Sequence, residues 1–521
     1  MSAKVIPRVV DQTSFLAGLI DKYKIVEHID RLGLVADDDR TQLKIGHRVK
    51  AILLSGLGFP ERTLYQAHQQ FEHLNVQRLF GAQGICAEDF DDNALGRGLD
   101  KIAEYGTSKL FSELAFELLT REGLLGKTLH IDSTSVKLFG QYEGADEDFA
   151  VPEYGYSRDK RPDLKQVVLT LVTAGSAGVP LWYQMDDGNQ SDKTGFHDTI
   201  SRVTSGLKET QDFLWVADGA LYSKKHLQAS TIRWLTRVPG TLKLAKQYQQ
   251  QTLTPDDVPE LNAKNRGMMV SAPKGERWLL VLSQEGRKRE EKTLEKRIVR
   301  EEDRLTKQLN ELSRQRYACV PDAVAAAEKF IKSLKWHTAT VSTDWHDEKS
   351  QTPGYQLLIT IQRDENKLCP DYNACGRFIL ATNDKDLTPE QMLTQYKEQD
   401  SVERGFRFLK DGEYRLNHIF LKKNKRIEAL MMVLTLGLLI YSVSQKQIRD
   451  LLVKTDQFYP NQKRKPMQNP TLRWILRRIS YDRICFLEQG GKVIDTCNVS
   501  PASMMLFKLM GKEVLAQYAL N

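Results

Sequence analysis

Three acidic residues, Asp132, Asp218 and Glu403, stand in sequence contexts that predict a shared site. Alternation along a predicted strand puts Asp132 on the same face as His130. Asp218 follows the apolar run 213–217, at the carboxyl end of a predicted buried strand, where open α/β sheets bind their ligands. Hard divalent cations take oxygen ligands, and two Mg²⁺ ions held by carboxylates can activate an attacking oxygen and stabilise a leaving oxygen at phosphorus. These residue types therefore predict phosphoryl transfer assisted by two Mg²⁺ ions, for which Mn²⁺ can substitute.

The third acid lies in residues 394–409, a segment without proline that is predicted to be one helix. Offsets of three, seven and fourteen residues from Tyr396 place Gln399, Glu403 and Lys410 on one stripe of that helix. The stripe would carry a phenol, an amide, a carboxylate and an ammonium group.

The chain resembles bacterial insertion-sequence transposases of the DDE class, in the group with a Tyr-x2-Arg-x3-Glu-x6-Lys signature around the third acid. Here the signature positions hold Tyr396, Gln399, Glu403 and Lys410, so glutamine stands in place of the arginine. Asp400, on the same predicted helix, does not occupy the acid position of the signature. Other segments that resemble this family occur in the family's order, at residues 130–134, 154–159, 188–192 and 217–220.

The resemblance implies an α/β chain with an RNase H-like mixed sheet, whose first strand is central and adjoins the fourth. Asp132 would then lie beside Asp218, and both would bind metal and act in catalysis together with Glu403. The implied activity is cut-and-paste DNA transposition, in which water hydrolyses a phosphodiester at the element end and the freed 3′-OH attacks the opposite strand or the target. The expected partner is double-stranded DNA, as terminal inverted repeats and target. Two ends must be cut together, which predicts a homodimer on DNA.

Positive charge is unevenly distributed along the chain. The net charge is +7, yet residues 421–480 contain 13 Lys and Arg against three acids. Clustered cations of this kind predict contacts with DNA phosphates, although a solvated basic face has the same pattern. Trp336 and Trp345 are candidates for stacking on an extruded base, with ordinary core aromatics as the alternative. The predicted DNA contacts are Tyr396, Arg407, Lys410, Lys463, Arg464, Lys465, Arg473 and Arg477.

Four regions are predicted. Residues 1–105 form an all-α N-terminal domain, with apolar helices at 15–29 and 49–57 and a turn at 56–60. The family resemblance implies that this domain binds DNA ends; a dimerisation or packing module is the alternative. Residues 106–240 and 389–460 form the catalytic domain. Residues 241–388 form an inserted β-rich and helical subdomain, and 461–521 a basic C-terminal region. In the catalytic domain we expect strands at 128–138, 166–173, 181–186, 213–217 and 232–238, and helices at 194–207 and 223–229.

Composition narrows the class of protein. With 41% hydrophobic and 27% charged residues, the 521-residue chain can form two or three domains, each with its own hydrophobic core. The first residues have no apolar signal region, and the apolar stretch 429–443 is too short for a bilayer, so no membrane is expected. The six cysteines lack zinc-ligand spacing, which favours free thiols in a bacterial cytoplasm, near the nucleoid. Two alternative functions are a structure-selective nuclease of the same fold and a domesticated DNA-binding protein with an inactive core.

Overall fold

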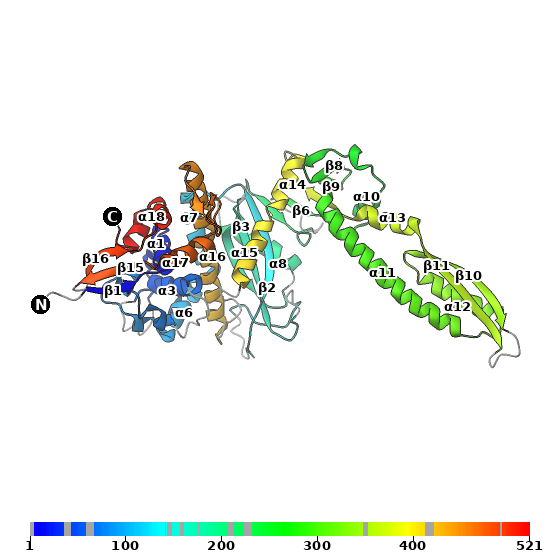
Figure 1. Cartoon of the computed structure of the whole chain (residues 1–521), viewed down its shortest axis with the longest axis horizontal. Coiled ribbons are helices and arrows are strands. Elements are labelled where there is room, and N and C mark those ends of the chain that lie inside the picture. The colour runs from blue at the N-terminus through cyan, green and yellow to red at the C-terminus, as the bar shows by residue number, and fades with distance from the viewer. Residues whose placement is uncertain are drawn as a thin grey trace. The chain divides into compact units, whose positions relative to one another are not determined.

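The chain forms two compact units in the computed structural model (Figure 1). The first unit comprises Met1–His226 with Lys397–Asn521, and the second comprises Leu227–Tyr396. The structure describes residues 5–35, 43–58, 67–140, 142, 148–156, 161–175, 177–190, 192–206, 212–222, 232–346, 353–411, 421–489 and 492–520.

Short helices form the N-terminal part of the first unit. The carboxylate of Asp11 accepts a hydrogen bond from the backbone N–H of Thr13 and caps the first helix. The rings of Phe71, Phe80 and Phe90 pack against one another at the centre of this part. The helices are α1 (Gln12–Lys22), α2 (Ile25–Arg31), α3 (Ile45–Gly58), α4 (Ala67–Phe71), α5 (Val76–Phe80), the 3₁₀ helix η2 (Ala87–Phe90), α6 (Asp92–Tyr105) and α7 (Thr107–Arg121).

Two predicted boundaries in this part are wrong. The helix predicted within 15–29 is interrupted at Lys24, whose left-handed backbone (φ 55°) separates α1 from α2. The turn predicted at 56–60 begins too early, because Gly56 and Gly58 belong to α3. The missing side chain of Gly56 lets α3 lie close to Leu434, since a β-carbon there would be 3.2 Å from the Leu434 side chain. Residues 59 and 60 lie outside the described residues.

The C-terminal residues complete the same helical part. Strand β1 (Val5–Val9) pairs with β15 (Cys485–Gln489), which pairs with β16 (Lys492–Cys497). Helix α1 packs against α17 (Leu472–Asp482) and α19 (Lys512–Gln517). On α18 (Pro501–Met510), Phe507 contacts the rings of Phe15 and Tyr518, with centroids 5.8 Å and 4.1 Å away. Residues beyond 461, which we predicted as a separate region, therefore share a core with the N-terminal helices.

A mixed sheet forms the rest of the first unit. Its strands are β2 (Thr128–Lys137), β3 (Gln166–Ala174), β4 (Val179–Asp186) and β5 (Leu214–Ala217), in the order β4-β3-β2-β5. The first three pair antiparallel, and β5 pairs parallel with β2. This arrangement, with the first strand next to the fourth, is that of the RNase H-like fold and confirms the predicted fold class.

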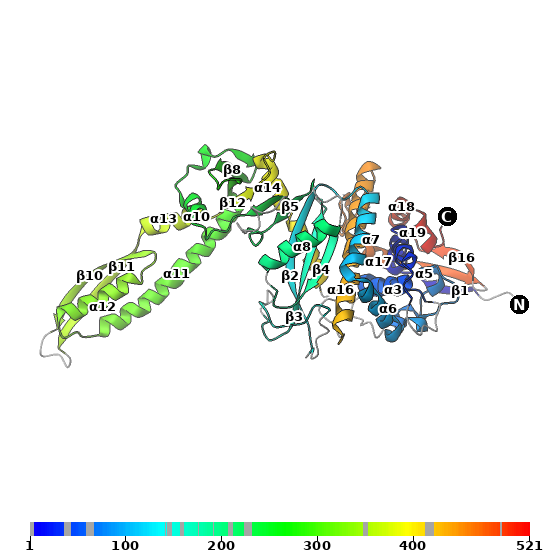
Figure 2. The ribbon, with the colours of Figure 1, turned by 180° about the vertical axis from the view of Figure 1, so that it is seen from behind.

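Helices cover both faces of this sheet. Helix α15 (Asp400–Lys410) packs on β2 and β3 and lies in front of them in Figure 1. Helix α8 (Asp192–Gly206), predicted at 194–207, lies on the opposite face, as the reverse view shows (Figure 2). The helix predicted at 223–229 lies outside the described residues.

Helix α16 (Asn424–Lys454) contains the apolar stretch noted in the sequence and packs against β4, α3, α6 and α7. Among the described helices it alone is long and apolar enough to cross a membrane, but 78% of its most apolar window is buried inside the protein. We therefore interpret α16 as a core helix.

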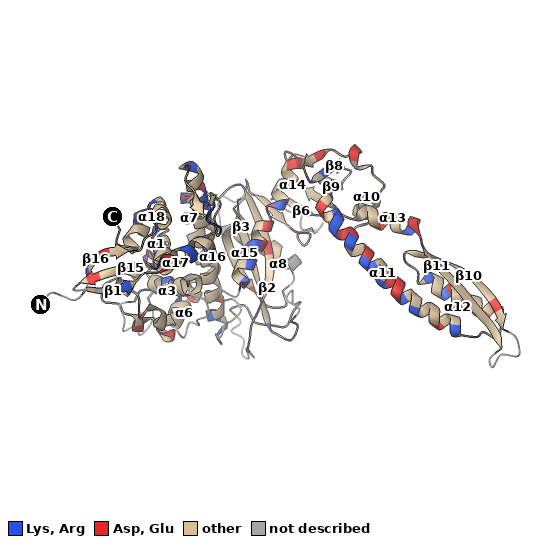
Figure 3. Cartoon of the chain, in the orientation of Figure 1, with Lys and Arg blue, Asp and Glu red and all other residues tan. Residues whose placement is uncertain are grey.

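The second unit contains a second set of strands and a long helical arm. Its strands are β6 (Arg233–Arg237), β12 (Arg377–Thr382), β9 (Arg277–Ser283), β8 (Asn265–Val270) and β7 (Glu260–Asn262), in that spatial order. The arm consists of α11 (Gln284–Arg314), α12 (Val320–Lys332) and the antiparallel pair β10 (His337–His346) and β11 (Gly354–Arg363). Figure 3 shows acidic and basic residues mixed along α11.

Buried Leu305 of α11 and Phe330 of α12 share one apolar cluster, so these two helices pack against each other. The other helices of this unit are α10 (Lys243–Gln250), η4 (Pro255–Asp257), α13 (Glu365–Ala374) and α14 (Pro389–Lys397).

Candidate active site

Asp132 and Asp218 come from neighbouring parallel strands. The register of β2 and β5 pairs His130 with Val216. Continued for two residues, the same register sets Asp132 opposite Asp218. Side chains at matched positions of neighbouring parallel strands lie side by side, since strands are about 4.8 Å apart. The two carboxylates therefore lie side by side where β5 ends, about halfway along β2.

Local hydrogen bonds orient both carboxylates. One oxygen of Asp132 accepts from the backbone N–H of Ser133 at 2.8 Å, and one oxygen of Asp218 accepts from that of Ala220 at 2.9 Å. Both side chains are half-buried. Because β5 ends at Ala217, Asp218 begins the following turn, where its side chain satisfies a backbone donor.

His130 shows which face of β2 meets helix α15. This side chain is fully buried, and its Nε2 lies 3.9 Å from the carboxylate of Glu398, just before α15. Burial lowers the pKa of His130 to about 4 and raises the pKa of Glu398, so the pair is a contact between a neutral imidazole and a carboxyl group rather than an ion pair at neutral pH. Since His130 and Asp132 share a face, Asp132 also lies on the α15 side of the sheet.

Glu403 lies on α15, but its side chain is exposed. Within the described residues, no group of three or more His, Cys, Asp and Glu side chains is close enough to hold a metal ion. The structure thus brings two of the three predicted acids together and places the third on the adjoining helix. The two aspartates supply the oxygen donors that a hard cation prefers, so they fit a divalent metal ion.

The predicted helix at 394–409 is wrong as a single element. It consists of α14 and α15, separated at Glu398 and Gln399. At this break Ser401 and Val402 donate their N–H groups to the carbonyls three residues earlier. The break places Glu398 beside buried His130, a tertiary contact that local helix propensity does not encode. The stripe from Tyr396 to Lys410 is therefore not one helix face, and Tyr396 packs instead near Phe378, with ring centroids 6.1 Å apart.

The predicted phosphate contacts differ in their surroundings. Lys463, Arg464 and Lys465 are exposed in the turn between β13 (Tyr459–Pro460) and β14 (Pro466–Met467). Arg477 is also exposed on α17, as is Arg407 on α15, while Lys410 is half-buried. Arg473 donates a hydrogen bond to Asp411 at 3.1 Å.

One basic run of the sequence has a structural role. Arg426 forms two hydrogen bonds with Asp100 of α6, at 2.9 Å and 2.7 Å, and Lys425 lies 3.4 Å from the same carboxylate. These cations tie the start of α16 to α6. The interpretation of Lys425 and Arg426 as phosphate contacts is therefore not supported by their surroundings.

The two candidate stacking tryptophans are not alike. Trp336 is buried against Leu294 and Ile298, and its indole N–H donates to Asp371 at 2.8 Å. Trp336 is therefore a core aromatic. Trp345 is half-exposed on the β10–β11 pair and contacts Tyr355, with ring centroids 4.8 Å apart.

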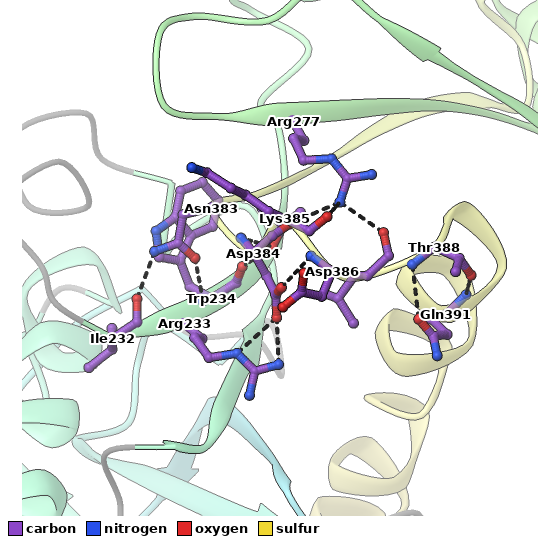
Figure 4. Close-up of polar contacts among 12 residues, drawn as sticks. Ile232, Arg233, Trp234, Arg277, Asn383, Asp384, Lys385, Asp386, Thr388 and Gln391 are labelled. Atoms are coloured by element: carbon purple, nitrogen blue, oxygen red, sulfur yellow. Dashed lines mark hydrogen bonds and ion pairs between the residues drawn. The ribbon is translucent and has the colours of Figure 1, made fainter.

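A polar network holds the segment between β12 and α14, in the second unit (Figure 4). Arg233 donates two hydrogen bonds to the carboxylate of Asp384. One guanidinium nitrogen of Arg277 donates to the carbonyl groups of Asp384, Lys385 and Leu387, at 2.8–3.0 Å. Arg233 and Arg277 thus fix the loop at residues 383–388, which precedes the signature that begins at Tyr396. No sequence pattern predicts this role of the two arginines.

Two family models match the chain. Residues 125–440 match the transposase DDE domain, and residues 6–116 match a domain of unknown function (DUF4277). No curated protein matches it. A similar solved structure is described as the cryo-EM structure of a piggyBac transposase synaptic complex with hairpin DNA; it has 8% identity and a TM-score of 0.39, covering 92% of this chain and 82% of its own.

The strand order and strand directions define a domain of RNase H-like type. The family match extends over more than half of the chain and includes all three acids. The chain belongs to the DDE transposase family.

Proposed function

We propose that this protein catalyses cut-and-paste transposition of an insertion sequence, cleaving DNA at the ends of the element and joining the freed 3′ ends to a target. The observation that carries the proposal is the parallel register of β2 and β5, which, when continued for two residues, sets Asp132 opposite Asp218 within the segment that matches the transposase DDE domain.

In this proposal Asp132, Asp218 and Glu403 hold divalent metal ions, with Mg²⁺ as the expected species. Such ions, when bound, activate the attacking oxygen and stabilise the leaving one. The chain itself supplies the positions: β2 and β5 fix the two aspartates, and α15 presents Glu403 on the Asp132 side of the sheet.

Double-stranded DNA is the proposed partner, bound as terminal inverted repeats and as target. The basic turn 463–465 and Arg407 support this proposal, since these side chains are exposed to solvent. We also propose that the protein acts as a homodimer on DNA, because two element ends must be cut together.

Acid-to-amide variants test the catalytic assignment. Asp132→Asn, Asp218→Asn and Glu403→Gln each remove a negative metal ligand with little change of shape. We expect each to lower the cleavage rate of a donor plasmid carrying the element ends by about 10³-fold or more, with DNA binding kept. Asp400→Asn, an exposed acid on the same helix, is the matched control and should cleave normally.

The outcomes separate the alternatives. Near-normal cleavage by one of the three variants removes that residue from the site, and an inactive Asp400→Asn chain beside an active Glu403→Gln chain makes Asp400 the third acid. Cleavage by the wild-type protein without joined products would identify a nuclease instead of a transposase.

A further inference from the structure

A cavity of about 570 Å³ lies beside the helix that carries Glu403. Helices α15 and α16, the start of α17 and the β3–β4 turn form its walls. Three arginines line it, Arg404, Arg407 and Arg473, and we call it the arginine pocket. Its volume lies in the range typical of small-ligand sites.

The electrostatics of the arginine pocket favour an anion. Asp411 is the one acidic residue among the described residues that line it, and Asp411 forms an ion pair with Arg473 at 3.1 Å. In the described part of the chain, Arg404 and Arg407 form no ion pair. Two exposed guanidinium groups therefore leave the pocket with positive charge.

The backbone adds to this charge. Helix α17 begins at the pocket, with Thr471 as its cap and no acidic residue in its first turn. The N-terminus of a helix carries a partial positive charge and binds phosphate groups readily. The hydroxyl group of Ser401, buried in the pocket wall, has no hydrogen-bond partner within the described residues.

The apolar wall suits a sugar next to the anion. Phe408 and Tyr441 line the pocket, with ring centroids 4.5 Å apart, and Leu438 lies beside them. In a DNA strand each phosphate is joined to a deoxyribose, whose carbon atoms can pack against such an apolar wall. A free inorganic phosphate would make no use of this wall.

The position on α15 relates the pocket to the candidate active site. Arg407 is four residues after Glu403 and lies on the same stripe of the helix, about 6 Å along its axis. That step is comparable to the distance between neighbouring phosphates of one strand. We infer that the arginine pocket binds a backbone phosphate of the DNA strand next to the phosphodiester cleaved at Glu403, and so sets the position of the scissile bond.

This inference rests on the proposed function, but its test does not need cleavage. The exposed side chains are changed together, as Arg404→Gln with Arg407→Gln, in the full-length chain. The matched control is Lys492→Gln with Lys508→Gln, which removes two exposed charges of the same unit on β16 and α18. Binding of duplex DNA of arbitrary sequence is measured at several salt concentrations. Loss of this phosphate contact should flatten the slope of log Kobs against log salt by about 0.9, while the control should keep the wild-type slope.

A second measurement distinguishes the ligands. Duplexes in which one phosphate at a time is replaced by a neutral methylphosphonate are prepared. Their binding by the wild type and by the arginine variant is then measured. One replacement should weaken binding by the wild type and leave the arginine variant unaffected, because that phosphate is already unbound there. Equal slopes for variant and control would overturn the inference. So would a variant that loses thermal stabilisation by inorganic phosphate but keeps its DNA slope, since the pocket would then bind a free anion.

The two proposals fail separately. An active Asp132→Asn chain would overturn the proposed metal site, while the salt slope would still report on the arginine pocket. Unchanged binding by the arginine variant, beside inactive acid variants, would overturn the pocket alone.

Discussion

The contact between the β3–β4 turn and helix α15 should be intolerant of a single methyl group. Gly178 has a left-handed backbone (φ 61°), and a β-carbon there would overlap the Cβ and Oγ atoms of Ser401 on α15. Gly178→Ala therefore combines two costs. The left-handed conformation costs about 1–2 kcal/mol for alanine, and overpacking costs about 1–3 kcal/mol more.

The same turn offers a matched control. Gly175 has nearly the same backbone (φ 63°), but its nearest neighbour, the carbonyl oxygen of Leu124, would be 3.2 Å from the added carbon. Gly175→Ala should therefore carry the backbone cost of about 1–2 kcal/mol with little of the overlap. The difference of about 1–3 kcal/mol between the two variants isolates the contact with α15.

Hydrogen exchange measured by mass spectrometry suits this prediction, because a chain of this size is not expected to unfold in one step. Amides of residues 400–410 should exchange roughly 5- to 150-fold faster in Gly178→Ala than in Gly175→Ala, which is the fold-change for about 1–3 kcal/mol. Peptides of the second unit should not change. Because α15 carries Glu403, we also expect slower cleavage by Gly178→Ala.

A double variant tests the cause. Adding Ser401→Gly removes the atoms that the new methyl group meets, at a cost of about 1 kcal/mol for glycine in a helix. Exchange at 400–410 should then slow towards that of Ser401→Gly alone. Equal exchange in Gly175→Ala and Gly178→Ala, or no recovery in the double variant, would refute the argument.

Two further predictions concern DNA. Replacing Lys463, Arg464 and Lys465 together by glutamine should weaken binding of all DNA sequences alike and flatten the salt dependence by about 0.9 for each lost contact; an unchanged slope would mean that this exposed turn is a solvated surface. For the homodimer, the mass of the protein on a DNA molecule carrying both element ends should correspond to two chains, with largely monomeric protein in the absence of DNA. One chain bound across both ends at saturating protein would contradict this assembly.

Local sequence patterns were sufficient for the strands that hold the site. β2, β3, β4 and β5 lie within two residues of their predicted ranges, because period-two alternation and apolar runs depend on neighbouring residues only. The pairing of β2 with β5 followed from the order of elements implied by the family. Asp132 and Asp218 were therefore foreseen as neighbours.

Long-range contacts explain what was missed. The break between α14 and α15 coincides with the contact of Glu398 with His130, more than 250 residues earlier, and no local pattern reveals it. Burial of Trp336 depends on Leu294 and Ile298 of α11. The arginine pocket was missed for the same reason, although Arg404 and Arg407 at a spacing of three could have indicated a shared helix face.

The N-terminal helices share a hydrophobic core with the C-terminal residues, and this has a consequence for biosynthesis. Arg8 on β1 forms an ion pair with Glu488 on β15, a separation of 480 residues. At a synthesis rate of roughly 5–20 residues per second, β15 is synthesised about 24–96 s after β1. The N-terminal helices therefore leave the ribosome with apolar surface uncovered, and this segment is where chaperones should bind the nascent chain.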